Sequence, residues 1–143
     1  MPDVAKTVLV PFSARQMYDL VANCEDYPAF LPWCAGGRIL EQSGDTVSAE
    51  LNIDFRGIRQ SFATRNVNVP GERIDMQLLS GPFKSLEGHW TFTPLAEDAC
   101  RIDFTLEYHF SSAILEKVIG PVFNHITTTF VDAFVKRAEA IYA

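Results

Sequence analysis

Few residues in this sequence have the types and the spacing that catalysis or metal binding requires. No G-x-S-x-G, H-E-x-x-H, phosphate-binding loop or glycine-rich dinucleotide turn occurs along the 143 residues. Cys24, Cys34 and Cys100 are odd in number and lack C-x-x-C spacing, which argues against a disulfide framework or a metal site and favours a reducing compartment. We therefore expect no catalytic residue, no metal and no enzymatic activity.

The remaining titratable groups do not form an acid–base pair. Alternation along the expected strands places the following residues on an outer face: Asp54, Glu87, His89, Asp103, Glu107 and His109. Cys34 follows Trp33 and could be a reactive thiol, although a small buried hydrophobic residue is the interpretation that we favour.

Alternating apolar and polar residues predict an antiparallel meander. The expected strands are Asp3–Val10, Arg38–Gln42, Thr46–Phe55, Gln60–Val69 and Glu72–Leu79, followed by two strands that carry Leu86–Phe92 and Ile102–Phe110. The alternation in the fourth strand is poor, because Phe62 shares its face with Gln60 and Thr64. Either a bulge interrupts this strand or polar groups point inward.

Two helices should accompany the strands. Ser13 and Gln16 have the spacing of a capping box, so a helix should begin at Ser13 and run to about Cys24. Ser112–Tyr142 is also helical, and we expect Gly120-Pro121 to divide it, so that the long helix begins at Pro121. One face of that helix carries Phe123, Ile126, Phe130, Phe134 and Ile141, with His125 on the opposite side.

These elements predict one α+β domain over residues 1–143, in which a curved antiparallel sheet wraps around the long C-terminal helix. The space between sheet and helix is a natural site for an apolar ligand, because ligand sites are usually apolar cavities of ~300–1,000 Å³. The residues expected to line this cavity are Leu51, Phe62, Met76, Trp90, Phe104, Tyr108, Phe123, Phe130 and Phe134. A solid core is the alternative interpretation of the same aromatic residues.

A few polar groups are candidates to anchor a ligand in the cavity. Gln60, Thr64 and Tyr108 could supply hydrogen bonds there. Arg137 borders the aromatic face of the helix and could anchor a ligand at one end. For Arg137 we favour another interpretation, in which its side chain extends to solvent or pairs with a carboxylate of the sheet.

Two interruptions of the pattern are rich in proline and large apolar residues, and we expect them to meet at the cavity mouth as a lid. The first contains Pro28, Phe30, Leu31, Pro32 and Trp33, and the second contains Gly81, Pro82 and Phe83. Loops can move at modest cost, as ligand exchange requires. For the first segment taken alone, the interpretation that we favour is that Phe30, Leu31 and Trp33 cap the core.

The charge balance limits the macromolecular partners. A net charge of −6 argues against non-specific binding to phosphate backbones, and we expect no specific DNA partner. Arg56, Arg59 and Arg65 come close together around one hairpin. We favour a solvated strand edge for these arginines, with a small basic patch as the alternative.

Three motifs and the order of the elements resemble a known family. The motifs are Y-P-A-F-L-P-W-C at Tyr27–Cys34, G-P-F-K-S-L-E-G-H-W-T-F at Gly81–Phe92 and F-V-K-R-A at Phe134–Ala138. They are similar to the coenzyme Q-binding, polyketide cyclase-related family of START-like proteins, whose fold is the helix grip. The resemblance covers essentially the whole chain, and the bacterial branch of the family includes the ribosome-association toxin.

The resemblance implies a non-catalytic protein that binds a quinone or another lipid. Our main hypothesis is that ubiquinone is the bound ligand, with no cofactor, and that the protein supports respiratory electron transport. For the toxin branch, the resemblance implies instead binding to the large ribosomal subunit, which blocks subunit joining. A cyclase-like or dehydratase-like enzyme is a more distant third hypothesis.

The sequence also suggests a location. It contains no run of 18 apolar residues and no signal-peptide pattern, so we expect no membrane-spanning helix. A bacterial cytoplasmic protein fits best, with peripheral location at the inner membrane, through a transient contact with the membrane surface, as an alternative.

Overall fold

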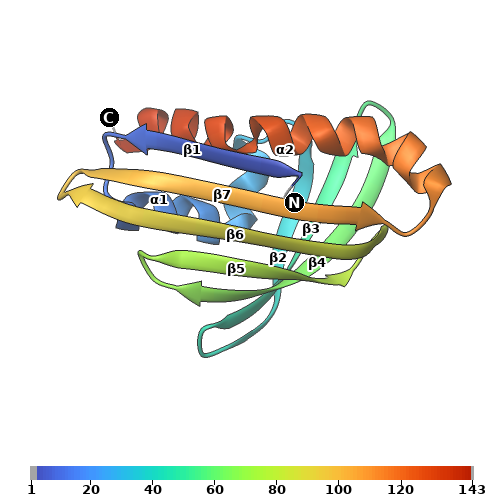
Figure 1. Ribbon diagram of the computed structural model, residues 1–143, viewed down its shortest axis with the longest axis horizontal. Coiled ribbons are helices and arrows are strands. Elements are labelled where there is room, and N and C mark those ends of the chain that lie inside the picture. The colour runs from blue at the N-terminus through green and yellow to red at the C-terminus, as the bar shows by residue number, and fades with distance from the viewer. Residues whose placement is uncertain (1–2, 143) are drawn as a thin grey trace.

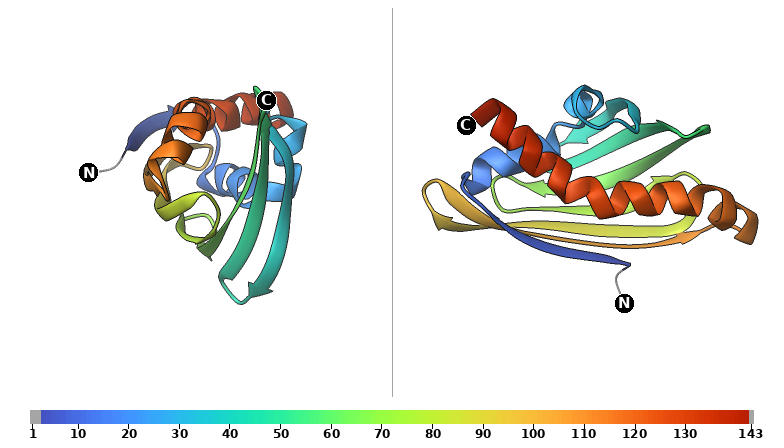
Figure 2. Two further views of the ribbon diagram at one scale, coloured as in Figure 1. Left: turned by 90° about the vertical axis from the view of Figure 1, so that its right-hand side faces the viewer. Right: turned by 90° about the horizontal axis from the view of Figure 1, so that it is seen from above.

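Seven antiparallel strands form one sheet that curves around a long helix in the computed structural model, which describes residues 3–142 (Figure 1). The elements are β1 (Val4–Val10), α1 (Ala14–Ala22), the short 3-10 helix η1 (Cys24–Ala29), β2 (Cys34–Ser43), β3 (Thr46–Phe55), β4 (Ile58–Val69), β5 (Arg73–Ser80), β6 (Phe83–Ala96), β7 (Ala99–Phe110) and α2 (Ala113–Tyr142). The order across the sheet is β1-β7-β6-β5-β4-β3-β2, and α2 lies along its concave side (Figure 2). The predicted α+β helix-grip fold is confirmed.

The first helix begins where its capping residues predict. The backbone N–H of Gln16 donates to Ser13 Oγ at 3.0 Å, and the backbone N–H of Ser13 donates to Gln16 Oε1 at 3.0 Å. These two bonds form a capping box, which satisfies donors that the first turn leaves free. The helix ends at Ala22, slightly before the predicted end, because Asn23 leaves the helical region and η1 follows.

The predicted break in the last helix does not occur. α2 is continuous from Ala113 to Tyr142 and contains Pro121 within it. The buried residues Ile119 and Val122 on either side of the proline pack into the core, and this packing holds both parts in one helix. The axis bends near the start of α2 (Figures 1 and 2), as expected where proline removes a backbone hydrogen bond. Ile141 is 46% exposed, so the buried face ends before it, contrary to the prediction.

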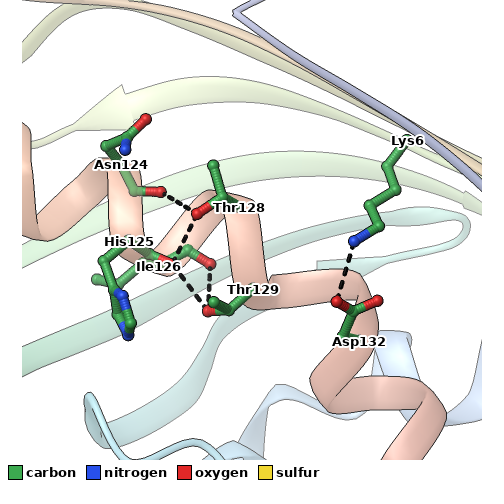
Figure 3. A network of polar contacts seen from close by, with 7 residues as sticks. All are labelled: Lys6, Asn124, His125, Ile126, Thr128, Thr129 and Asp132. Atoms are coloured by element: carbon green, nitrogen blue, oxygen red, sulfur yellow. Dashed lines mark hydrogen bonds and ion pairs between the residues drawn. The ribbon is translucent and has the colours of Figure 1, made fainter.

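Three consecutive threonines in α2 satisfy their hydroxyls within the helix itself. Thr128 Oγ1 donates to the carbonyl of Asn124 at 2.8 Å, and Thr129 Oγ1 donates to the carbonyl of His125 at 2.8 Å (Figure 3). Thr127 Oγ1 also donates to the carbonyl of Asn124, at 3.2 Å. Such back-bonding lets threonines occupy a helix without needing partners on other elements.

Strand β4 combines both explanations that its sequence left open. A register shift against β5 lies between Ala63 and Thr64, which is a bulge-type irregularity. Polar groups also point inward, since Thr64 is buried and Asn66 and Asn68 face the interior. The strand therefore places a row of polar side chains against an otherwise apolar core.

Judged by length and hydropathy alone, α2 is long and apolar enough to cross a membrane. Its residues Ile119, Phe123, Ile126 and Phe134 are each no more than 4% exposed and pack against the sheet. Core packing therefore accounts for these residues, whereas Ile114 and Val118 near the start of the helix are 75% and 53% exposed.

Candidate functional site

A small internal cavity of about 80 Å³ lies between the concave face of the sheet and α2. Strands β2 to β7, the segment from α1 to η1, and α2 all contribute to its wall. Besides the residues predicted from the sequence, its apolar lining includes Val21, Trp33, Ile39, Val47, Ala49, Ile74, Leu86, Leu106 and Ile126. The wall is thus built mainly from aliphatic and aromatic carbon.

The structure brings seven of the nine predicted lining residues together. They are Leu51, Phe62, Met76, Trp90, Phe104, Phe123 and Phe130. Tyr108 lies outside the lining, because it packs edge-on against Phe123 at 4.7 Å between ring centroids. Phe134 is fully buried and also lies outside, packed against Tyr27 at 5.3 Å and Phe30 at 5.4 Å.

The polar groups of the cavity come mainly from β4. Thr64 lines the cavity as predicted, and its hydroxyl donates to Asn66 Oδ1 at 2.8 Å. Asn68 also lines the cavity, and its buried Oδ1 has no hydrogen-bond partner among the described residues. Thr127 of α2 completes this polar set. Sequence reasoning missed the two asparagines, although they share the strand face of Phe62 and Thr64.

Gln60 and Arg137 do not reach the cavity. Gln60 instead borders a shallow outer depression with Asn52 and Arg59. It lies near the start of β4, opposite Ile53 of β3. The Arg137 guanidinium lies over the Phe30 ring, 5.2 Å from its centroid, in agreement with the favoured interpretation of a side chain at the surface.

The two predicted lid segments do not meet. Trp33 lines the cavity, and its ring centroid lies 5.9 Å from that of Phe130. Leu31 is buried in the core. Phe83 instead packs on Phe123 at 4.9 Å. Since Phe123 and Phe130 are seven residues apart in α2, the two segments touch this helix roughly 10 Å apart. Their buried apolar residues cap two different parts of the core.

The exposed residues of the two segments are few. Pro28, Pro32 and Gly81 are exposed, and Pro82 is buried like Phe83. Gly81 has a φ of 141°, and a Cβ there would lie 2.6 Å from Phe62 Cβ, so the turn before β6 needs glycine.

The titratable groups that line the cavity are neutral. Burial, with Glu25 nearby, raises the pKa of the Cys24 thiol to about 11. Burial also raises the pKa of Tyr27, whose hydroxyl donates to the carbonyl of Val21. The described lining contains no carboxylate, histidine, lysine or arginine. The cavity can therefore bind apolar groups, but its lining supplies no charged group for proton transfer.

The outer face of the sheet holds the histidine–carboxylate contacts. His89 Nδ1 lies 2.8 Å from Asp75 Oδ1, and its Nε2 lies 3.3 Å from Glu87. Among residues 3–142, no group of three or more histidines, cysteines and carboxylates could hold a metal ion. Cys34 is buried and its pKa is raised by burial, in agreement with a packing role.

The volume of the cavity limits what can occupy it in this conformation. An internal cavity of ~150 Å³ accepts benzene, and sites for drug-sized ligands are ~300–1,000 Å³. At about 80 Å³, the cavity is too small for a substituted quinone ring unless side chains move.

A larger groove of about 530 Å³ lies on the surface, between α2 and the segments that precede β2 and end β3. We call it the α2 groove. Its lining residues are Phe30, Leu31, Pro32, Trp33, Phe55, His125, Thr129, Asp132, Ala133, Lys136, Arg137 and Ala140. Sequence reasoning missed it, because Phe55 and His125 lie 70 residues apart and only the fold brings them together.

Aromatic and basic side chains meet in the α2 groove. The His125 imidazole stacks on the Phe55 ring at 5.4 Å and 11° between planes. Sequence periodicity had placed His125 opposite the aromatic face, but the end of β3 reaches around and half-buries it. The Arg56 guanidinium lies over the Phe55 ring, 4.8 Å from its centroid.

The three arginines of the predicted hairpin patch do not act as one cluster. Arg59 pairs with Asp54 at 3.4 Å. Arg65 lies six residues further along β4, roughly 20 Å away at the usual rise of a strand. Both are exposed on the sheet, which is the favoured interpretation, whereas Arg56 lies beside the α2 groove.

Comparison with known proteins identifies the family. Residues 10–135 match the family described as polyketide cyclase / dehydrase and lipid transport. The chain belongs to this family. The aromatase/cyclase Zhui from Streptomyces sp. R1128 has the same fold, with a TM-score of 0.85 at 18% identity over 98% of this chain and 94% of that one. The 18 kDa protein CC1736 from Caulobacter crescentus has a TM-score of 0.74 at 33% identity, over 97% of both chains.

Relatives with higher identity have names that refer to toxins. The persistence and stress-resistance toxin PasT of Escherichia coli O6:H1 is 44% identical over 143 residues, which cover 100% of this chain and 90% of the relative. The ribosome association toxin RatA of Escherichia coli K12 is 43% identical over the same shares. The mitochondrial coenzyme Q-binding protein COQ10 homolog B of Xenopus laevis is 28% identical, over 98% of this chain and 59% of the relative.

Proposed function

We propose that this protein associates with the large ribosomal subunit and hinders its joining to the small subunit. The observation that carries the proposal is 43% identity, over the whole chain, to a protein named ribosome association toxin. The small volume of the cavity supports it, because a carrier of a quinone should hold more space than about 80 Å³. The bacterial relatives also support a cytoplasmic location.

The charge of the protein restricts ribosome binding to a limited part of its surface. The net charge is −6, so the molecule as a whole is repelled by RNA. Six of the 12 basic residues are paired with carboxylates; they are Lys6, Arg15, Arg38, Arg59, Arg73 and Arg101. Binding to a ribosome must therefore use a limited surface on which cations are not neutralised.

Pelleting with purified subunits tests the proposal. We expect saturable binding to large subunits and much weaker binding to small subunits. Binding should weaken as salt rises, because phosphate contacts release counterions. Equal, non-saturating recovery with both subunits would count against a specific ribosomal partner.

A second function is supported by the lining of the cavity. We propose a hydrophobic ligand, with ubiquinone as the first candidate, on the basis of the apolar wall and the Asn68 Oδ1 atom that has no partner among the described residues. The similarity to a protein named coenzyme Q-binding supports the same proposal. The cavity would have to enlarge for a ring to enter, with a loading contact at a membrane surface.

Native mass spectrometry of protein purified from its own host, with lipid extraction, tests the second function. For a carrier, we expect the mass of a quinone bound to at least a fraction of the protein molecules. Protein free of any extractable lipid would contradict it.

A further inference from the structure

The α2 groove has the chemistry of a site for unpaired RNA bases. Proteins that bind single-stranded RNA combine cations for the phosphates with aromatic faces on which bases stack. We propose that the α2 groove binds a single-stranded segment of RNA, with a base stacked on the Phe55–His125 pair and phosphates beside Lys136 and Arg137. This inference rests on the proposed ribosomal function and assigns it a surface.

The charge of the α2 groove is opposite to that of the molecule. Lys136 and Arg137 line it, and neither forms an ion pair with a carboxylate of residues 3–142. Asp132 is the one carboxylate among the described lining residues, and Lys6 Nζ binds it at 3.0 Å (Figure 3). On an acidic protein, this groove therefore presents cations that are free to meet phosphates.

The aromatic groups of the α2 groove have the geometry of a stacking platform. His125 and Phe55 are almost parallel, at 11°, and Arg56 covers the Phe55 ring. The three planar groups lie together where the end of β3 and the turn after it approach the middle of α2. A base can stack on this group, because every base has a π-face and guanidinium and imidazole planes stack on it.

Neighbouring charges give the bound strand a direction. Asp19 and Asp26 line a second depression on the far side of Arg137 and Phe30. Arg15 pairs with Asp19 at 3.0 Å, but Asp26 has no cationic partner among the described residues and would repel phosphates. The strand should therefore leave the groove past Lys136 toward Arg56. The outer face of the sheet is a poorer alternative, since Arg59 is already paired with Asp54.

Affinity for large subunits and for a mixed-sequence single-stranded RNA oligonucleotide tests the site. The double variant Lys136→Gln/Arg137→Gln should bind at least about tenfold more weakly, and the slope of log K against log salt should fall by roughly 0.7 for each phosphate that the variant no longer neutralises. The control is Lys84→Gln/Lys117→Gln, which removes the same charge from exposed residues outside the groove. The control should stay within about twofold of wild type. Equal decreases in affinity for both double variants would overturn the site.

His125→Ala separates stacking from charge. We expect a loss of affinity of about fivefold or more with an unchanged salt slope, because the variant removes an aromatic face for a base and leaves every phosphate-binding cation in place. Unchanged affinity of His125→Ala for both ligands would overturn the platform. Circular dichroism of each variant must match wild type, so that weaker binding cannot come from unfolding.

The outcomes distinguish the site from the proposed function. If large subunits bind wild type and all variants equally, the ribosomal function stands and the groove is wrong. If the oligonucleotide binds through the groove and subunits do not bind, the groove stands and the function is wrong. Ultraviolet cross-links from the groove to ribosomal protein, with none to ribosomal RNA, would also overturn the site.

Discussion

Phe130 is the residue at which the two proposed functions differ most clearly. It lines the cavity, and its ring lies 5.9 Å from Trp33, 5.7 Å from Trp90 and 5.0 Å from Phe134. A ligand that entered the cavity would have to displace this ring or pack against it. The ribosomal function does not require any access to Phe130, because the α2 groove is built from other residues.

Phe130→Trp should therefore leave binding to large subunits unchanged. The larger ring fills the cavity, and overpacking typically costs about 1–3 kcal/mol of stability. If the protein also carries a quinone, the same variant should lose that binding. Subunit pelleting and quinone titration on the same preparation check both outcomes. Parallel loss of both activities would contradict the assignment of separate sites.

Cys24 makes stability depend on pH in the alkaline range. Its pKa is raised from 9.0 to about 11 by burial. Between these values the unfolded thiol has lost its proton and the folded thiol keeps it, so the folded state binds more protons and stability falls as pH rises. The free energy of unfolding should drop by up to about 2 to 3 kcal/mol from pH 8.5 to pH 11.

Urea unfolding of wild type and Cys24→Ala at several pH values measures this effect. The alanine variant should show a smaller decrease, with a residual decrease from Cys34, Cys100 and Tyr27, whose pKa values are also raised by burial. Identical pH profiles for the two proteins would contradict a protonated, buried Cys24.

At the scale of elements, the sequence predicts those segments in which local pattern and packing agree. Thr46–Phe55 alternates cleanly and is β3 with the predicted bounds, and the Ser13 capping box forms. Local chemistry fails at Pro121, because packing of the neighbouring residues outweighs the cost of proline within a helix. The lid prediction fails for a related reason: two segments of similar composition pack on α2 about two turns apart, and composition carries no information on that distance.

The contact between η1 and β2 gives a prediction with a matched control. A Cβ at Gly37 would overlap the carbonyl oxygen of Cys24, which is backbone and cannot rotate away. A Cβ at Gly36 would meet the Asn52 amide at 2.8 Å, and that side chain can move. Gly37→Ala should lower the free energy of unfolding by more than about 2 kcal/mol, and Gly36→Ala should lower it by less than about 1 kcal/mol.

Chemical denaturation of the two glycine variants decides the point. Similar stability for both would show that η1 does not approach β2 as closely as described. Since η1 carries Cys24 and Tyr27 into the cavity wall, Gly37→Ala should also perturb the cavity.

At the scale of the whole molecule, the core residues could be predicted from the sequence, but the surface groove could not. Seven predicted residues line the cavity, because strand alternation and helical period identify the inner faces. The α2 groove could not be predicted in the same way, since it needs Phe55 and His125 to meet across the fold. The sequence also did not predict which cations are paired. Arg56, Arg59 and Arg65 are close in the sequence, yet the groove cations that pair with no carboxylate of residues 3–142 are Lys136 and Arg137, near the C-terminal end of α2.

Subunit joining, followed on sucrose gradients at fixed salt, tests ribosomal association most directly. With wild-type protein added to separated subunits, we predict that the large subunit carries the protein down the gradient and that the amount of joined ribosome falls with protein concentration. Lys136→Gln/Arg137→Gln should restore joining, and Phe130→Trp should not. Undiminished joining, with the protein remaining at the top of the gradient at saturating concentration, would contradict the proposed function.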